Sequence, residues 1–249
     1  EGLHAAVPAH MFALFGSANL KDWTRLSDIP PLGCGECPDF FELPVDGDRN
    51  NTRWVFWGGS GNYLVGRFDG KTFTKESGPF PSRFGAHDYA AQTYSDIPAA
   101  DGRRIQISWM AGGRYPGMPF NQQMTVPRVL TLRTTAEGIR LFIEPVKEVE
   151  SLRAKEHTWQ NVALSETPLS LEPAAGDLFD IEATLEPGSA ATIGVHVRGH
   201  KIEYAVKDGD ARRPVRAPCQ RGQPDAGRRV AQADGLRHDA RLADAQQAP

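Results

Sequence analysis

The chain has 249 residues, a length that accommodates one large domain or two smaller ones. Its 28 basic and 31 acidic side chains give a formal charge of -3, which argues against nucleic acid or an anionic membrane as the main partner, because both select for clustered lysine and arginine. Hydrophobic residues make up 40% of the chain, enough for a packed core, yet no apolar run approaches the roughly 18 residues of a membrane span.

The first 145 residues are predicted to form short antiparallel strands, because apolar and β-branched runs alternate with turn signals such as Asp69-Gly70. Ile105, Ile107 and Trp109 alternate with polar residues and are predicted to share one face of a strand. No segment before residue 145 has helical periodicity. The predicted strands lie at residues 53–57, 63–68, 72–74, 104–110, 129–133 and 139–143.

The pattern changes at Pro145, after which apolar residues spaced three apart predict a short connecting helix. Alternation then resumes in segments typical of half-buried strands in a β-sandwich. These four or so strands are fewer than the seven that such a sandwich normally needs, so it is predicted to be truncated. The later strands are expected at residues 179–185, 193–197 and 202–206.

The end of the chain has a different composition from the rest. Residues 211–249 contain nine alanines and eight arginines but no lysine, isoleucine or aromatic residue. Such a segment buries too little apolar surface to offset its chain entropy. It is interpreted either as a disordered linker or as an out-of-frame translation of a GC-rich gene, and the second interpretation is favoured because it also explains the unfinished sandwich.

The three cysteines are too few for a disulfide scaffold. Cys34 and Cys37 form a C-x-x-C pair, but a zinc site would need a second pair or two histidines at ligand spacing, and Cys219 lies far away. Unpaired thiols are therefore the expectation, and no metal or cofactor is expected.

Glu36 is the candidate general acid. It lies between Gly35 and Cys37 and just before an apolar segment, where partial desolvation would favour the protonated carboxyl that a general acid supplies. From spacing alone, a solvated loop glutamate is the favoured interpretation.

The segment Glu36-Cys37-Pro38-Asp39-Phe40-Phe41-Glu42-Leu43 resembles the Glu-Cys-Pro-Asp signature of glycoside hydrolase family 32, the invertases, levanases and inulinases. Other segments resemble this family in the same order, over residues 12 to about 207. They are Ser17-Ala18-Asn19-Leu20-Lys21-Asp22-Trp23, residues 58–63 with 68–73, Tyr89-Ala90-Ala91-Gln92-Thr93-Tyr94, and residues 105–110, 116–124 and 176–181.

The resemblance implies an all-β fold, a partial five-bladed β-propeller followed by a truncated β-sandwich. Residues 1–145 would be later propeller blades, 146–156 a linker with a short helix, 157–207 the start of the sandwich, and 208–249 the aberrant tail. It also implies hydrolysis of terminal β-fructosyl bonds in sucrose, levan or inulin with retention, a reaction that uses two carboxyl groups roughly 5–5.5 Å apart.

Glu36 matches the family's acid/base position. Trp109 matches an aromatic residue that lines the sugar pocket, although a core tryptophan fits the spacing equally well. Tyr89 is a second, weaker substrate-binding candidate, for which core packing is the favoured interpretation. Asp39 is expected to be structural. His87 and Asp88 stand where many relatives carry other residues, and Gly85-Ala86 stands where some relatives place an acid near the leaving-group site, which leaves specificity beyond the fructose site open.

Two motifs of the family are absent from the chain, the Asn-Asp-Pro segment that carries the nucleophile and an Arg-Asp-Pro segment that binds fructose hydroxyls. The chain, which begins without methionine or signal peptide, is therefore expected to be an inactive fragment of a β-fructosidase. The alternatives are a truncated gene product, a carbohydrate-binding remnant and a structural propeller. Targeting cannot be read, but an extracellular or periplasmic location is expected for a fructan hydrolase, with the cytoplasm also open.

Overall fold

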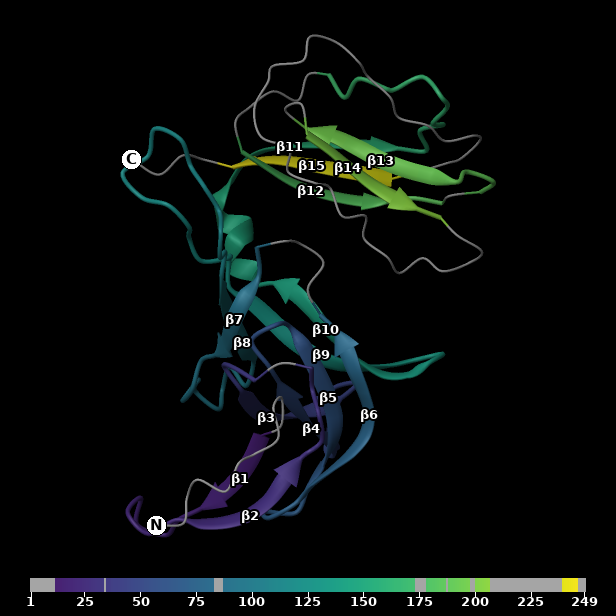
Figure 1. The fold of residues 1–249 in the computed structure, drawn as a ribbon. Coiled ribbons are helices and arrows are strands. Elements are labelled where there is room, and N and C mark those ends of the chain that lie inside the picture. Colours follow the sequence, from purple (N-terminus) through teal and green to yellow (C-terminus); the bar gives the residue numbers. More distant parts are fainter. Residues whose placement is uncertain are drawn as a thin grey trace. The chain divides into compact units, whose positions relative to one another are not determined.

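The computed structural model describes residues 12–33, 35–82, 87–172, 178–186, 188–197, 200–206 and 239–245, with 200–205 and 239–245 as backbone only. The chain divides into two compact units, Glu1–Val146 and Lys147–Pro249 (Figure 1). Nearly all the described regular structure is β-strand, in agreement with the predicted all-β class. No helix in this part of the chain is long and apolar enough to cross a membrane.

The first unit contains a hairpin and two antiparallel meanders of four strands each. The meanders join where β3 and β9 meet in parallel at Val45 and Leu132. Four-stranded sheets of this kind are the repeating blades of β-propellers. The hairpin is β1 (Phe12–Gly16) and β2 (Thr24–Ile29); the first meander is β3 (Asp39–Val45), β4 (Asp48–Trp57), β5 (Asn62–Phe68) and β6 (Phe73–Pro81); the second is β7 (Tyr89–Thr93), β8 (Arg104–Trp109), β9 (Arg128–Thr135) and β10 (Gly138–Pro145).

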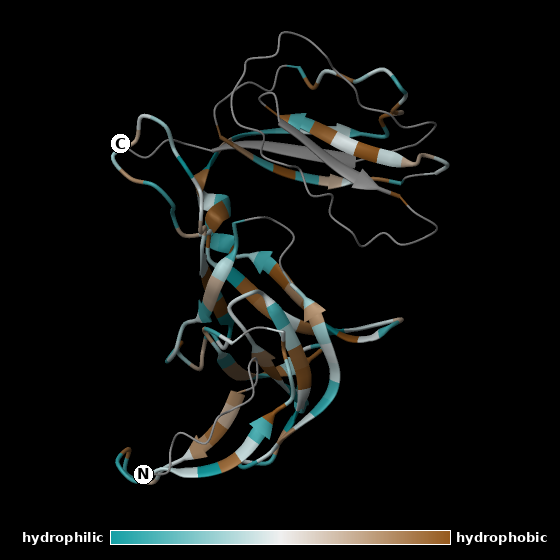
Figure 2. Cartoon of the chain, in the orientation of Figure 1, coloured by the Kyte–Doolittle hydropathy of each residue, from teal (hydrophilic) through white to brown (hydrophobic). Residues whose placement is uncertain are grey.

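The first meander is buried on both faces because successive strand residues point to opposite sides. Val55 and Trp57 belong to a core shared with the second meander, whereas Phe56 between them belongs to a core shared with the β1–β2 hairpin. Figure 2 colours the strands by hydropathy and shows apolar positions recurring along them. The second meander and the hairpin therefore cover the two sides of one sheet.

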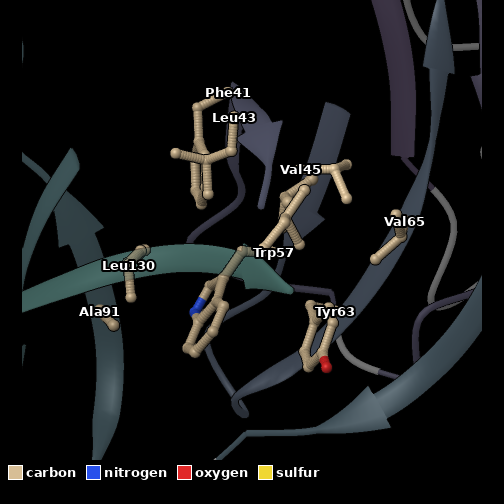
Figure 3. Packing of buried hydrophobic residues seen from close by; sticks show 10 residues of the cluster. Phe41, Leu43, Val45, Trp57, Tyr63, Val65, Ala91 and Leu130 are labelled. Carbon is tan, nitrogen blue, oxygen red and sulfur yellow. The ribbon is translucent and has the colours of Figure 1, made fainter. Parts of the chain in front are cut away.

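Trp57 is the largest side chain of the core between the meanders (Figure 3). Its ring stacks on Tyr63 with centroids 6.3 Å apart. The Tyr63 hydroxyl accepts a hydrogen bond from the N–H of Leu141 on β10 at 3.1 Å, and burial raises the pKa of this phenol. The hydroxyl of a buried tyrosine in the first meander thus links it to the second meander, in addition to aliphatic contacts in the shared core.

Strand β8 inverts the expected burial. The predicted face of Ile105, Ile107 and Trp109 is only partly covered, and Trp109 is 41% exposed. The polar residues between them, Gln106 and Ser108, are completely buried because both accept hydrogen bonds from the Arg128 guanidinium. Alternation located this strand, but a buried arginine decides which face is inside.

The turn between β3 and β4 holds the two meanders together. Asp46 and Gly47 both have positive φ, 53° and 80°, which is the signature of a type I′ hairpin turn. The Asp46 carboxylate accepts hydrogen bonds from the N–H of Thr134 at 2.8 Å and from its hydroxyl at 2.6 Å. These bonds hold the pKa of Asp46 below its usual value, and the bond from the Thr134 hydroxyl has the larger effect.

Asp46→Asn is expected to lower the melting temperature of the chain at neutral pH. A depressed folded-state pKa stabilises the fold above the unfolded pKa of about 3.9, and this contribution disappears as the pH falls through the folded pKa. The difference from wild type should therefore close in acid. Thermal melts from pH 7 to pH 2 measure it, with Asp48→Asn in the same hairpin as the control. A difference that does not change with pH would contradict the assignment.

The second unit begins with a 3-10 helix, η1 (Lys147–Leu152), where a short helix was predicted. β11 follows at once, so the first residues of this strand lie inside the predicted 146–156 linker. The described strands form a three-stranded sheet, β11-β15-β12, and a separate β13–β14 pair. Their bounds are β11 (Arg153–Gln160), β12 (Phe179–Thr184), β13 (Thr192–Val197), β14 (His200–Ala205) and β15 (Asp239–Ala245).

Strand β15 lies within the predicted aberrant tail. Its backbone pairs antiparallel with β11 on one side and β12 on the other. Residues 207–238 and 246–249 lie outside the described residues. Disorder and an out-of-frame origin for this tail therefore stay predictions.

Candidate active site

Glu36 lies in the loop that leads into β3. Its main-chain carbonyl accepts a hydrogen bond from the N–H of Gly59 at 2.9 Å. The following residue, Cys37, has a φ of 48°, in the left-handed region that is uncommon for residues other than glycine. Glu36 itself is exposed, contrary to the expected desolvation.

Tyr89 brings the second meander to this carboxyl group. It is the first residue of β7, and its hydroxyl donates a hydrogen bond to Oε2 of Glu36. Tyr89 also pairs across the strands with Trp109 on β8, with ring centroids 6.4 Å apart in an edge-to-face arrangement. The three residues singled out from the sequence are therefore neighbours, although they come from segments up to 73 positions apart.

Trp109 and Tyr89 differ in exposure. Trp109 is 41% exposed, so it is not a core tryptophan in the part of the chain that the structure describes. Tyr89 is half-buried, and its hydroxyl reaches the carboxyl group instead of ending in the core. An exposed aromatic face beside a carboxyl group suits a ligand that presents a C–H surface and an oxygen that can accept a proton.

Asp39 has the structural role predicted for it. Its Oδ2 accepts a hydrogen bond from the N–H of Thr93 at 2.7 Å, which ties the start of β3 to the end of β7. The Gln92 side chain adds a hydrogen bond to the carbonyl of Cys37 at 3.3 Å. Both contacts fix the segment that carries Glu36 against the strand that carries Tyr89.

A buried arginine network supports the second meander next to the site. Arg128 on β9 pairs with Asp88, with Nη1 and Oδ2 2.6 Å apart and side chains only 13% and 16% exposed. Asp88 precedes Tyr89, and Ser108, which also accepts a hydrogen bond from Arg128, precedes Trp109. The sequence reasoning missed Arg128, whose only signal was a charged residue opening an apolar strand.

The remaining sequence candidates are placed as follows. His87 contacts the carbonyl of Ala111 through Nδ1 at 2.6 Å, while Gly85 and Ala86 lie outside the described residues. Cys37 is a free, half-buried thiol, and Cys34 and Cys219 also lie outside the described part. Among the residues that the structure describes, there is no group of three histidine, cysteine or acidic side chains that could hold a metal ion.

Fold and site together define a β-propeller protein in which a carboxyl group and two aromatic rings gather at the starts of two blades. Residues 4–145 match the family model described as the N-terminal domain of glycosyl hydrolases family 32. The chain therefore belongs to glycosyl hydrolase family 32, as the sequence motifs had indicated.

Relatives of this chain are considerably longer than the chain itself. It is 37% identical to a levanase of Bacillus subtilis (strain 168) over 80% of its own length and 33% of that protein's. It is 32% identical to a sucrose-6-phosphate hydrolase of Zymomonas mobilis (strain ATCC 31821) over 75% of its length and 40% of that protein's. The crystal structure of an exo-inulinase from Aspergillus awamori has a TM-score of 0.62 and 25% identity, covering 79% of this chain and 44% of that one. The chain thus spans about a third of the levanase.

Proposed function

We propose that Glu36, Tyr89 and Trp109 form the acid/base side of the active site of a glycosidase. This enzyme would remove terminal β-fructosyl units from sucrose or a fructan. The observation that carries the proposal is the hydrogen bond from Tyr89 to Glu36, beside the exposed ring of Trp109. The levanase, exo-inulinase and sucrose-6-phosphate hydrolase relatives support the choice of substrate class.

In this mechanism Glu36 acts twice. It first protonates the oxygen of the departing sugar, and afterwards its carboxylate activates the water molecule that releases fructose. Trp109 would hold the sugar by its C–H face, and Tyr89 would hold the carboxyl group. A retaining reaction also needs a second carboxylate as nucleophile. The Asn-Asp-Pro and Arg-Asp-Pro motifs of the family do not occur in the sequence of these 249 residues.

A second candidate is a carbohydrate-binding remnant without turnover, which the exposed ring of Trp109 also fits. The two functions differ in turnover and not in recognition. A remnant would bind fructose or a fructan through Trp109 without releasing product. DNA upstream of Glu1 discriminates between them, since in-frame Asn-Asp-Pro and Arg-Asp-Pro codons support the enzyme and a stop codon supports the remnant.

The test compares the 249-residue chain with a protein that includes whatever the gene encodes upstream of Glu1. We expect the longer protein to release fructose from sucrose, levan or inulin, and the short chain to release none. Free fructose is measured over time, and early NMR spectra identify the anomer released, which should be the β form. A longer protein that binds fructans without turnover would support the remnant, and fructose release by the short chain would refute its predicted inactivity.

A further inference from the structure

Gly59 connects the two segments that carry Glu36 and Tyr89. It lies in the turn between β4 and β5, where its N–H donates to the carbonyl of Glu36 at 2.9 Å. Its carbonyl accepts from the N–H of Ala90, the residue after Tyr89, at 3.0 Å. A single buried glycine therefore fixes the main chain at both partners of the Tyr89–Glu36 hydrogen bond.

The turn that carries Gly59 is itself held firmly. The N–H of Gly58 donates to the carbonyl of Asn62 at 3.0 Å, and the Asn62 side chain donates to the carbonyl of Leu32 at 3.1 Å. The stacked rings of Trp57 and Tyr63 flank the turn on its two sides. The position of Gly59 is therefore fixed by contacts within the first meander and does not depend on the Glu36 loop.

Both segments bonded to Gly59 contain a residue in the left-handed region. Cys37, next to Glu36, has a φ of 48°, and Ala90, next to Tyr89, has a φ of 51°. Such conformations are unfavourable for a residue other than glycine and persist only where surrounding contacts over-determine them. The two hydrogen bonds of Gly59 are contacts of this kind, adjacent to both unfavourable residues.

A side chain at position 59 would disturb this arrangement. A Cβ atom built there would lie 3.1 Å from Cβ of Cys37 and 3.2 Å from the carbonyl oxygen of Glu36. Both separations are tighter than ordinary van der Waals contact, so the Glu36–Cys37 segment would have to move. Because general acid catalysis depends on the placement of the proton donor, a shift of this kind would reach the chemistry.

We propose that Gly59 is a positioning residue for proton transfer by Glu36. Its two main-chain hydrogen bonds and its missing side chain place the Glu36 carboxyl against the Tyr89 hydroxyl and toward the oxygen of the departing group. The inference rests on the proposed function and adds a residue that acts through Glu36 without touching the sugar.

The experiment uses the protein that includes the upstream coding region and compares Gly59→Ala with Gly35→Ala. Gly35 is the matched control because a Cβ there would meet nothing within 4 Å. The kcat/KM is measured for sucrose, which needs a protonated leaving oxygen, and for p-nitrophenyl β-D-fructofuranoside, whose leaving group departs with little help. Gly59→Ala should lower the first by about 10- to 100-fold and the second by less than about threefold.

A second variant separates misplacement from misfolding. Cys37→Gly removes the side chain that the new methyl group meets and tolerates the left-handed φ, so it should restore part of the sucrose activity in the Gly59→Ala background. Equal losses for both substrates, or no loss at all, would overturn the inference while leaving the proposed function intact. A wild-type protein that releases no fructose would overturn both.

Discussion

Glu36→Gln should reduce kcat for sucrose or a fructan by about 10²- to 10⁴-fold in the protein that includes the upstream coding region. Glutamine keeps the size of the side chain and can still accept the hydrogen bond from Tyr89, but it has no proton to give and cannot activate water. Binding should change much less than turnover. Steady-state kinetics, with fructose affinity measured by calorimetry, separates the two effects.

Glu42→Gln is the matched control for this substitution. Glu42 belongs to the same segment, residues 36–43, is exposed on β3, and accepts a hydrogen bond from the hydroxyl of Thr52. It should leave kcat close to the wild-type value.

Added azide, which attacks without general-base help, should accelerate the release step in Glu36→Gln. Unchanged turnover in Glu36→Gln would remove Glu36 from the acid/base role.

Arg128→Met should destabilise the propeller unit by about 3–5 kcal/mol, the range for breaking a buried ion pair. The substitution removes the guanidinium from Asp88 and from Gln106 and Ser108, which are completely buried. These polar groups would stay in a largely dry site without it. Urea unfolding followed by tryptophan fluorescence measures the loss as a shift of the midpoint.

Arg133→Met on the same strand provides the comparison. Arg133 pairs with Glu144 at the surface, with side chains 39% and 54% exposed, and such pairs contribute about 1 kcal/mol or less. Asp88→Asn combined with Arg128→Met should recover part of the stability, because it removes the charge that had lost its partner. If the two arginine variants were equally stable, the buried network would not be holding β7, β8 and β9 together.

Much of the propeller unit was predictable because its strands are short and alternate. The strand at 104–110, the 129–143 hairpin and the meander around Asp69-Gly70 all correspond to strands of the structure. β1 and β2 were not predicted, since each is brief and forms half of an isolated hairpin. β15 could not be anticipated, because its composition indicates no strand and its pairing is entirely with distant segments.

The candidate site was predictable only as a set of residues. The motif pointed to Glu36, and the resemblance added Trp109 and Tyr89, but spacing cannot show that a tyrosine hydroxyl meets a carboxyl 53 positions away. Nor could it show that Glu36 is exposed or that Gln106 and Ser108 are the buried residues of β8. Those facts depend on which blade faces which, and on one arginine that no periodicity indicates.

The Asp46–Thr134 contact lies beyond one end of β3 and Glu36 lies before the other. A strand of seven residues rises about 3.3 Å per residue, so roughly 20 Å of rigid backbone separates them. Substitutions around the Asp46–Thr134 contact could therefore raise the melting temperature without changing the surroundings of Glu36. Directed evolution could therefore change thermal stability and catalytic rate separately, through residues at opposite ends of the same strand.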